Sequence, residues 1–184
     1  MKKHADIAAK ILRSGGVIAY PTEGVFGLGC LPSEELAIKR ILNIKNRDAS
    51  KGLILIASDA KQLDPWIKLP TKVSLPKPVD KYPVTWIVPY SAKISKLVTG
   101  KNKGVAIRLT INPIVQSICS AVESAVISTS ANLSGQPTVK NQTELKEKFV
   151  DLVDYIVPGN CGPALGPSEI RNLITGQVLR HGTK

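Results

Sequence analysis

The stretch Ala125-Val126-Ile127-Ser128-Thr129-Ser130-Ala131-Asn132-Leu133-Ser134-Gly135 joins a short apolar segment to a run of hydroxyl and amide side chains. The segment 125–127 is short, β-branched and followed by turn-forming residues, which predicts a buried strand. Open α/β sheets bind ligands where their strands end, and Ser, Thr and Asn can hydrogen-bond a polar ligand without adding charge. The run after the strand therefore predicts a ligand-binding loop, with an ordinary surface turn as the alternative.

Helical and strand patterns alternate along the rest of the chain. Apolar spacing predicts helices over residues 5–13, 34–44, 112–122 and 142–149. Ser33 is expected to cap the second of these helices and Asn112 the third. Ser58 is expected to cap a further short helix that runs toward Trp66. Apolar runs predict strands over 17–20, 53–57, 84–88, 104–109, 125–127 and 153–157, and a closing hairpin over 170–180. This alternation predicts one α/β domain over residues 1–184, with a twisted mixed sheet and flanking helices.

The composition is basic and poor in aromatic residues. The chain has 25 Lys and Arg against 14 Asp and Glu, a net charge of +11, which attracts polyanions such as nucleotides or nucleic acid. The alternative is a basic, solvated surface without a dedicated partner. Aromatic residues make up only 4% of the chain, and single-stranded RNA is usually recognised by aromatic stacking.

The sequence also suggests where the protein works. We expect no membrane span and no signal peptide, because no apolar run is long enough. Cys30, Cys119 and Cys161 are scattered and odd in number, which favours a reducing compartment, and so a cytoplasmic location, over a disulfide framework. No Cys/His cluster has the spacing of metal ligands, so no protein-bound metal site is expected.

Two further clusters could hold a ligand. Residues 20–29, YPTEGVFGLG, follow a predicted strand and contain three glycines that let a backbone approach a ligand closely, but they match neither a Walker loop nor a dinucleotide fingerprint. Residues 45–52 hold Lys45, Arg47 and Lys51 within seven positions. Three such cations suit a triphosphate, and the alternative is a solvated basic loop.

Arg108 is a cation in an otherwise apolar predicted strand. Because an arginine is rarely buried without a partner, it meets either an internal carboxylate or the carboxylate or phosphate of a ligand. The only histidines, His4 and His181, lie near the chain ends, so a Ser-His-Asp triad is not expected. Without a covalent catalyst, the chain favours a reaction driven by positioning and charge stabilisation, such as nucleotidyl or phosphoryl transfer.

Together and in order, these clusters resemble the Sua5/YciO/YrdC family. The resemblance extends from about residue 6 to residue 182, and its motifs lie at residues 19–30, 45–47, 51–57, 105–108, 128–135 and 167–171. It implies an α/β fold around a basic cavity and an enzyme that converts L-threonine, bicarbonate and ATP to threonylcarbamoyl-AMP and pyrophosphate. The product would serve N6-threonylcarbamoylation of adenosine 37 in tRNA. Mg²⁺ would accompany the ATP, and a monomer with no membrane partner is expected.

The resemblance also implies site residues. Lys45 and Arg47 are expected to act as catalytic cations, and the threonine-binding set is Thr22, Arg108 and Ser128. The expected nucleotide-binding set is Lys45, Arg47, Lys51, Thr85, Ser130, Asn132, Ser168 and Arg180.

The chain departs from the family pattern at two motifs and in the segment between Ile67 and Pro83, which is short and proline-rich where relatives tend to have a helix. Asp48 stands where the family usually has proline after Lys-x-Arg, and it either weakens ATP binding or points outward. Asp80-Lys81-Tyr82-Pro83 replaces Trp-Pro-Gly-Pro before the strand that holds Thr85. Two alternatives stay open: a non-catalytic RNA-binding member of the family, which the net charge of +11 favours, or a divergent paralogue with another nucleotide reaction, which the altered segment 80–83 allows.

Overall fold

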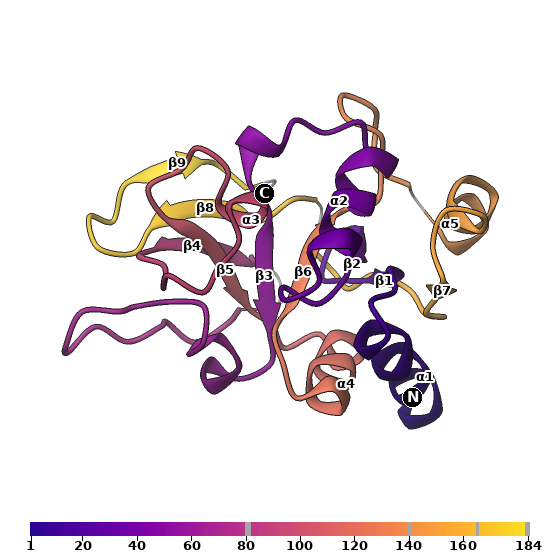
Figure 1. Ribbon diagram of the computed structural model, residues 1–184, viewed down its shortest axis with the longest axis horizontal. Coiled ribbons are helices and arrows are strands. Elements are labelled where there is room, and N and C mark those ends of the chain that lie inside the picture. Colours follow the sequence, from indigo (N-terminus) through magenta and orange to yellow (C-terminus); the bar gives the residue numbers. More distant parts are fainter. Residues whose placement is uncertain (80–81, 140, 165, 183–184) are drawn as a thin grey trace.

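The computed structural model describes residues 1–79, 82–139, 141–164 and 166–182. Within these residues, the chain forms one nine-stranded sheet in the order β7-β1-β2-β6-β3-β5-β4-β8-β9 (Figure 1). The strands are β1 (Ile18–Pro21), β2 (Phe26–Gly29), β3 (Ile54–Ala57), β4 (Val84–Val88), β5 (Val105–Leu109), β6 (Val126–Ser130), β7 (Tyr155–Ile156), β8 (Glu169–Asn172) and β9 (Val178–Arg180).

The sheet is mixed. Its parallel pairs are β1–β7, β3–β5 and β4–β8, and the other neighbours in the described sheet are antiparallel. The helices are α1 (Lys2–Arg13), α2 (Glu35–Ile44), α3 (Lys96–Thr99), α4 (Pro113–Val122) and α5 (Gln142–Phe149), with 3₁₀ turns η1 (Ala49–Lys51) and η2 (Ala60–Leu63). The predicted fold class, an α/β fold with a mixed sheet and flanking helices, is confirmed.

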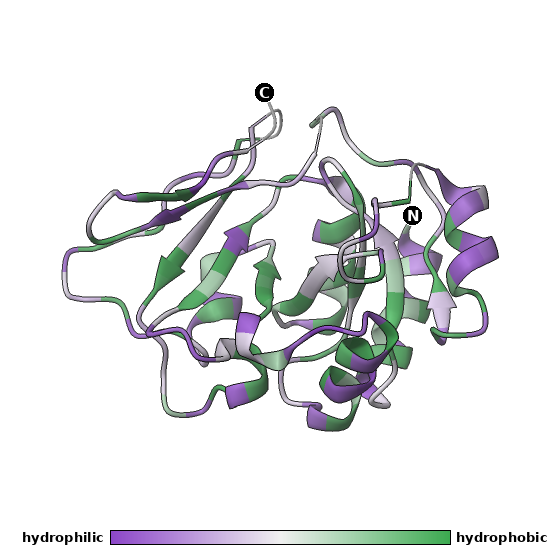
Figure 2. Ribbon diagram, turned by 90° about the horizontal axis from the view of Figure 1, so that it is seen from above, coloured by the Kyte–Doolittle hydropathy of each residue, from purple (hydrophilic) through white to green (hydrophobic). Residues whose placement is uncertain are grey.

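Helices cover both faces of the sheet. Side chains alternate along β1, so Ala19 packs in a core with Ile41 of α2, whereas Tyr20 packs in a core with Leu12 of α1 and Ile118 of α4. Figure 1 shows α1 and α4 side by side on one side of the sheet and α2 on the other. Figure 2 shows the central strands mostly hydrophobic and the helices with both hydrophobic and hydrophilic bands, as expected for helices that cover a core.

Several predicted elements are confirmed by their caps or pairing. Helix α4 begins at Pro113, and the Asn112 side chain accepts hydrogen bonds from the backbone of Ile114 and Val115. Helix α5 and the closing hairpin of β8 and β9 also form as predicted. Residues 69–79 contain no helix or strand, as their prolines predict; Asp80 and Lys81 lie outside the described residues.

Other elements differ from the prediction. Strand β2, within the glycine-rich stretch, was not predicted; Gly29 leaves room there for the ring of Tyr20, because a Cβ would lie 2.8 Å from it. The cap of α2 is Glu34, without a side-chain hydrogen bond, in place of Ser33. Asp59, not Ser58, caps η2. The sequence also gave no signal for α3, a single short turn capped by Ser95.

Strand β6 continues through Ser130, so the polar run that follows residue 127 begins within the sheet. This placement corrects the expectation that the whole run is a loop. None of the helices in the described residues is long and apolar enough to cross a membrane.

Candidate functional site

Strand pairing gathers polar side chains on one face of the sheet. Arg108 of β5 is paired with Ile56 of β3, which belongs to the core beneath α1 and α4, and Ser128 of β6 is paired with Ile54. Paired residues place their side chains on the same face, so Arg108 and Ser128 share a face although 20 residues separate them. On this face, outside the area that α1 and α4 cover, lies a cavity of about 140 Å³.

The cavity lining comes from six parts of the chain. Its members among the described residues are Thr22, Val25, Gly27, Arg47, Gly52, Leu53, Ile54, Arg108, Ser128, Thr129, Ser130, Pro167, Ser168 and Arg180. The structure therefore brings together seven of the residues that the sequence singled out: Thr22, Arg47, Arg108, Ser128, Ser130, Ser168 and Arg180. It does not place Lys45, Lys51, Thr85 or Asn132 in this lining.

Three guanidinium groups converge on the cavity: those of Arg47, Arg108 and Arg180. Partial burial lowers the pKa of Arg180, and the positive charges of Arg108 and Arg47 lower it further. Burial likewise lowers the pKa of Arg47. Since each of these charges disfavours the others, an anion bound between them would be strongly attracted.

Arg47 and Arg180 keep donors free for such an anion. Arg47 donates from Nη2 to the backbone oxygen of Gly52 at 3.0 Å, and its buried Nε has no partner among the described residues. Arg180 donates from Nη2 to the backbone oxygen of Ser168 at 2.7 Å. Because a guanidinium has five N–H groups, both side chains are anchored to the backbone and can still bind oxygen atoms.

Arg108 resolves the alternatives that its sequence position left open. Its Nη2 lies 3.4 Å from Oε2 of Glu23, and the two side chains are 9% and 2% exposed. Arg108 thus meets an internal carboxylate and also lines the cavity. Sequence reasoning assigned Glu23 no role; the available signal was that a buried arginine requires a carboxylate, and Glu23 stands in the glycine-rich motif.

The hydroxyl groups are partly used by the protein itself. Thr22 donates from Oγ1 to the backbone oxygen of Val25 at 2.7 Å, which closes the turn between β1 and β2. The hydroxyls of Thr85 and Ser168 share a 2.7 Å hydrogen bond. Thr85 is fully buried and Ser168 lines the cavity, so Thr85 orients a residue of the lining from behind it.

Lys45 is a buried cation without a carboxylate beside it in the described structure. Its Nζ donates to the backbone oxygens of Ser130 and Asn132, the latter at 2.7 Å, and to Oδ1 of Asn132 at 3.0 Å. All three N–H groups are therefore used to fix the turn that follows β6. Burial, followed by the positive charge of Arg47, lowers the pKa of Lys45 to about 8. Its assignment as a catalytic cation stays a prediction.

Asn132 is held in the same network. Its Oδ1 accepts from Ser130 Oγ at 2.6 Å, and its Nδ2 donates to the backbone oxygens of Leu133 and Gln136. The side chain thus shapes the turn that presents Ser130, and its direct contact with a nucleotide stays a prediction.

Lys51 and Asp48 lie at the two ends of η1. Lys51 is exposed. Asp48 caps η1, because its side chain accepts from the backbone of Ser50 at 2.8 Å, and hydrogen bonds from Ser50 lower the pKa of Asp48. Asp48 is exposed, so of the two alternatives for this departure from the family pattern, the structure supports an outward-pointing side chain.

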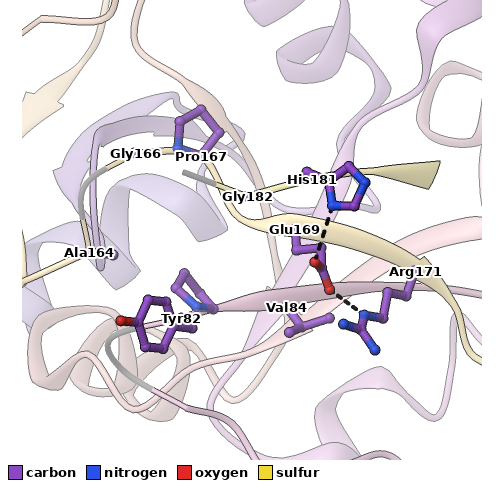
Figure 3. Close-up of a pocket in the computed structure, with 10 residues that line it drawn as sticks. Tyr82, Val84, Ala164, Gly166, Pro167, Glu169, Arg171, His181 and Gly182 are labelled. Carbon is purple, nitrogen blue, oxygen red and sulfur yellow. Dashed lines mark hydrogen bonds and ion pairs between the residues drawn. The ribbon is translucent and has the colours of Figure 1, made fainter. Parts of the chain in front are cut away.

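A second cavity, of about 430 Å³, adjoins the first at Pro167, which lines both. Figure 3 shows its charged side chains turned toward one another. Glu169 accepts from Nε of Arg171 and lies 4.0 Å from Nδ1 of His181. Since its lining holds one arginine and a carboxylate, whereas the first cavity has three arginines and no carboxylate in its described lining, this cavity is the weaker candidate for an anionic substrate.

The family model for Sua5, YciO and YrdC, described as "Telomere recombination", matches residues 10–182. This chain belongs to the Sua5/YciO/YrdC family. A relative from Vibrio vulnificus, named threonylcarbamoyl-AMP synthase, is 46% identical over 187 residues that cover 99% of this chain and 100% of the relative. One of the same name from Nitrosococcus oceani is 44% identical over 177 residues, which cover 95% of each chain.

Solved structures of the family share the fold. P. abyssi Sua5 complexed with L-threonine superposes with a TM-score of 0.86 at 29% identity, covering 99% of this chain and 55% of that one. E. coli YciO superposes with a TM-score of 0.82 at 26% identity, covering 100% of this chain and 91% of that one. The resemblance stated from the sequence motifs is therefore confirmed in sequence and in fold.

The buried ammonium of Lys45 predicts a pH dependence of stability. Its pKa of about 8 in the folded protein lies below the ordinary value of 10.5, so between these values the unfolded chain binds more protons. Stability then rises with pH, by at most about 1.4 kcal/mol per pH unit. We expect the difference in unfolding free energy between wild type and Lys45→Met to rise from about pH 8 to pH 10 in chemical denaturation.

Lys51→Met is the matched control, because it removes an exposed amine from the neighbouring turn and gives the background titration. A difference between wild type and Lys45→Met that stays flat over the same pH range would show that the ammonium of Lys45 is not desolvated.

Proposed function

We propose that this protein converts L-threonine, bicarbonate and ATP to threonylcarbamoyl-AMP and pyrophosphate. The convergence of Arg47, Arg108 and Arg180 on one small cavity carries the proposal, because carboxylate, phosphate and carbamate are all anions. Relatives at 40–46% identity are named for this activity, and a family structure at 29% identity was solved with L-threonine. Both facts support the same substrates here.

Threonine fits the part of the cavity around Arg108. The guanidinium can form two parallel hydrogen bonds to the amino acid carboxylate. Thr22 and Ser128 lie on the same side, where a Cβ added to Gly27 would be 3.4 Å from each of their side chains. Their hydroxyls can hydrogen-bond the side-chain hydroxyl of threonine, and a site built for such a bond discriminates against analogues that lack it.

ATP fits the side of Arg47 and Arg180. In the proposed reaction, the threonine amine bonds to the bicarbonate carbon and water leaves, which gives a carbamate. A carbamate oxygen then attacks the α-phosphorus, and the bond to pyrophosphate breaks. The two guanidiniums would stabilise the charge that develops on pyrophosphate. The hydroxyl of Ser168, which shares a hydrogen bond with Thr85, can donate to the nucleotide, whereas that of Ser130 donates to Asn132 and can accept from the nucleotide. Small-molecule pockets usually exceed about 300 Å³, so the nucleoside would extend beyond the 140 Å³ cavity.

The lining does not suit a magnesium ion held by the protein. Magnesium prefers carboxylate, phosphate and water oxygens, and none of the described lining residues carries a carboxylate. Glu23, behind the lining, is already engaged with Arg108 and Thr110. We therefore propose that magnesium is held by the phosphates of ATP, and no residue of this chain is assigned to it.

The biological role follows from the proposed product. Threonylcarbamoyl-AMP would be consumed by a reaction that modifies tRNA, so a cytoplasmic location and a hand-off to that machinery are part of the proposal. The alternatives are a non-catalytic RNA-binding protein and a paralogue with another nucleotide reaction. The arginines are gathered in a cavity and not spread over an open surface, which favours a small anionic substrate over RNA phosphates.

The first experiment measures pyrophosphate release from ATP with magnesium and bicarbonate, with and without L-threonine. We expect release to depend on threonine, and Arg108→Lys to lower kcat/KM for threonine by about 100-fold, because lysine cannot form the bidentate contact. Lysine is preferable to alanine here, since it leaves a cation beside the buried Glu23.

Arg171→Lys is the matched control, because it changes an arginine of the neighbouring cavity, and its kcat/KM should stay close to that of wild type. Folded wild-type protein that binds ATP but releases no pyrophosphate with threonine would contradict the proposed reaction. Stabilisation by RNA alone in a thermal shift assay would then favour the RNA-binding alternative.

Substitutions at two glycines of β2 test separately whether this strand contributes to ligand binding and to stability. In Gly27→Ala the new methyl group would contact Ser128 and Thr22 at ordinary distances but would occupy the cavity. We expect stability to change by less than about 1 kcal/mol and L-threonine binding, measured by calorimetry, to weaken by about tenfold or more.

Gly29→Ala is the comparison on the same strand. Its Cβ would lie 2.4 Å from the backbone oxygen of Ile127, so we expect a loss of about 2 kcal/mol of stability. If Gly27→Ala bound threonine as wild type does, threonine would not occupy the space between Thr22 and Ser128.

A further inference from the structure

Glu23 is a carboxylate buried behind the cavity wall. The residue is 2% exposed, and its Oε2 faces Nη2 of Arg108 at 3.4 Å. Moving a single charge out of water costs several kcal/mol unless an opposite charge lies close by. The two groups therefore make each other's burial possible, and neither has another ion-pair partner among the described residues.

Contacts from two further segments hold Glu23 in place. Thr110, which follows β5, donates from Oγ1 to Oε1 of Glu23, and the same hydroxyl accepts from the backbone of Asn112 at 3.0 Å. The backbone oxygen of Glu23 accepts from Ala164 at 2.9 Å. Next to it, a Cβ on Gly24 would lie 2.5 Å from the backbone oxygen of Gly166. The carboxylate is thus fixed by the cap of α4 and by the segment before β8.

The pairing of Glu23 with Arg108 leaves capacity for a ligand. Glu23 Oε2 and Arg108 Nε are both buried and lack a hydrogen-bond partner in the described structure. An unpaired buried polar group costs about 1–3 kcal/mol. A second carboxylate entering the cavity could accept from Arg108 while Glu23 holds the other side of the guanidinium.

Glu23 also makes Arg108 electrostatically different from the other two arginines. Among the described residues, no carboxylate lies within ion-pair distance of Arg47 or Arg180. Arg108 therefore has a carboxylate at ion-pair distance, whereas Arg180 has none in the described structure and Arg47 feels only the more distant charge of Asp48. A carboxylate with one charge suits the first environment, and a polyphosphate suits the second.

We propose that Glu23 is the positioning residue of Arg108: it orients the guanidinium for the threonine carboxylate and directs phosphate away from that subsite. This inference rests on the proposed function, since it assigns Arg108 to threonine. Glu23 is not among the residues that line the cavity, so it acts through Arg108.

The test compares wild type with Glu23→Gln, which keeps the size of the side chain and an acceptor for Thr110 but removes the charge. Binding of L-threonine and of inorganic pyrophosphate is measured by calorimetry. We expect the Kd for threonine to rise about tenfold. Pyrophosphate should bind severalfold more tightly and become a competitor of threonine, which it is not in wild type. In turnover, KM for threonine should rise while kcat stays within about twofold.

Two further variants separate positioning from folding. Thr110→Val keeps both charges but releases one side of the carboxylate, so it should raise KM for threonine without making pyrophosphate competitive. Glu169→Gln, which removes the partner of Arg171 in the neighbouring cavity, should change neither KM for threonine nor the Kd for pyrophosphate. Thr110→Val also tests positioning if Glu23→Gln fails to fold.

The outcomes distinguish the two levels of the proposal. If wild type binds threonine, and Glu23→Gln binds threonine and pyrophosphate each as tightly as wild type does, Glu23 has no positioning role and the proposed function stands. If Thr110→Val leaves KM unchanged, the orientation of the carboxylate does not matter and the inference fails. If wild-type protein binds no threonine, the proposed function fails, and the role of Glu23 with it.

Discussion

The guanidinium of Arg108 is a charge set between the apolar residues of β5, and much of the site is arranged around it. A buried cation needs a counter-charge, which Glu23 supplies from the turn between β1 and β2. Thr110 and Ala164 hold Glu23 in place by hydrogen bonds to its carboxylate and to its backbone oxygen. One buried charge therefore ties together three parts of the chain that lie far apart in sequence, and these parts form one wall of the cavity.

Lys45 shows a second way to bury a cation. Its ammonium has no carboxylate partner in the described structure and is held by oxygens of Ser130 and Asn132. The cost of this arrangement appears as a pKa lowered to about 8. In return, the turn after β6 is fixed, and Ser130 is presented to the cavity from a rigid element. Catalytic sites depend on such support from behind.

The three arginines divide the cavity electrostatically. Arg108 is offset by a carboxylate, while Arg47 and Arg180 are anchored only by backbone oxygens in the described structure. The side of the cavity near Arg108 therefore suits a ligand group with a single negative charge, and the side near Arg47 and Arg180 suits a group with several negative charges. Such a division suits an enzyme that joins an amino acid to a nucleotide, because both substrates carry anionic groups and each must reach its own position.

The sequence by itself determined most of the elements and half of the described lining. Apolar periodicity predicted α1, α4, α5 and most strands, because an element that buries one face has apolar residues at regular spacing along its sequence. The family motifs pointed to Thr22, Arg47, Arg108, Ser128, Ser130, Ser168 and Arg180, all of which line the cavity. Only the tertiary structure decided which polar groups face the ligand and which face the protein. Glu23, Lys45 and Thr85 are polar residues whose side chains instead meet partners far away in sequence: Arg108, Asn132 and Ser168. Local patterns carry no information about such partners, because burial and hydrogen bonding depend on contacts that form only when the chain is folded.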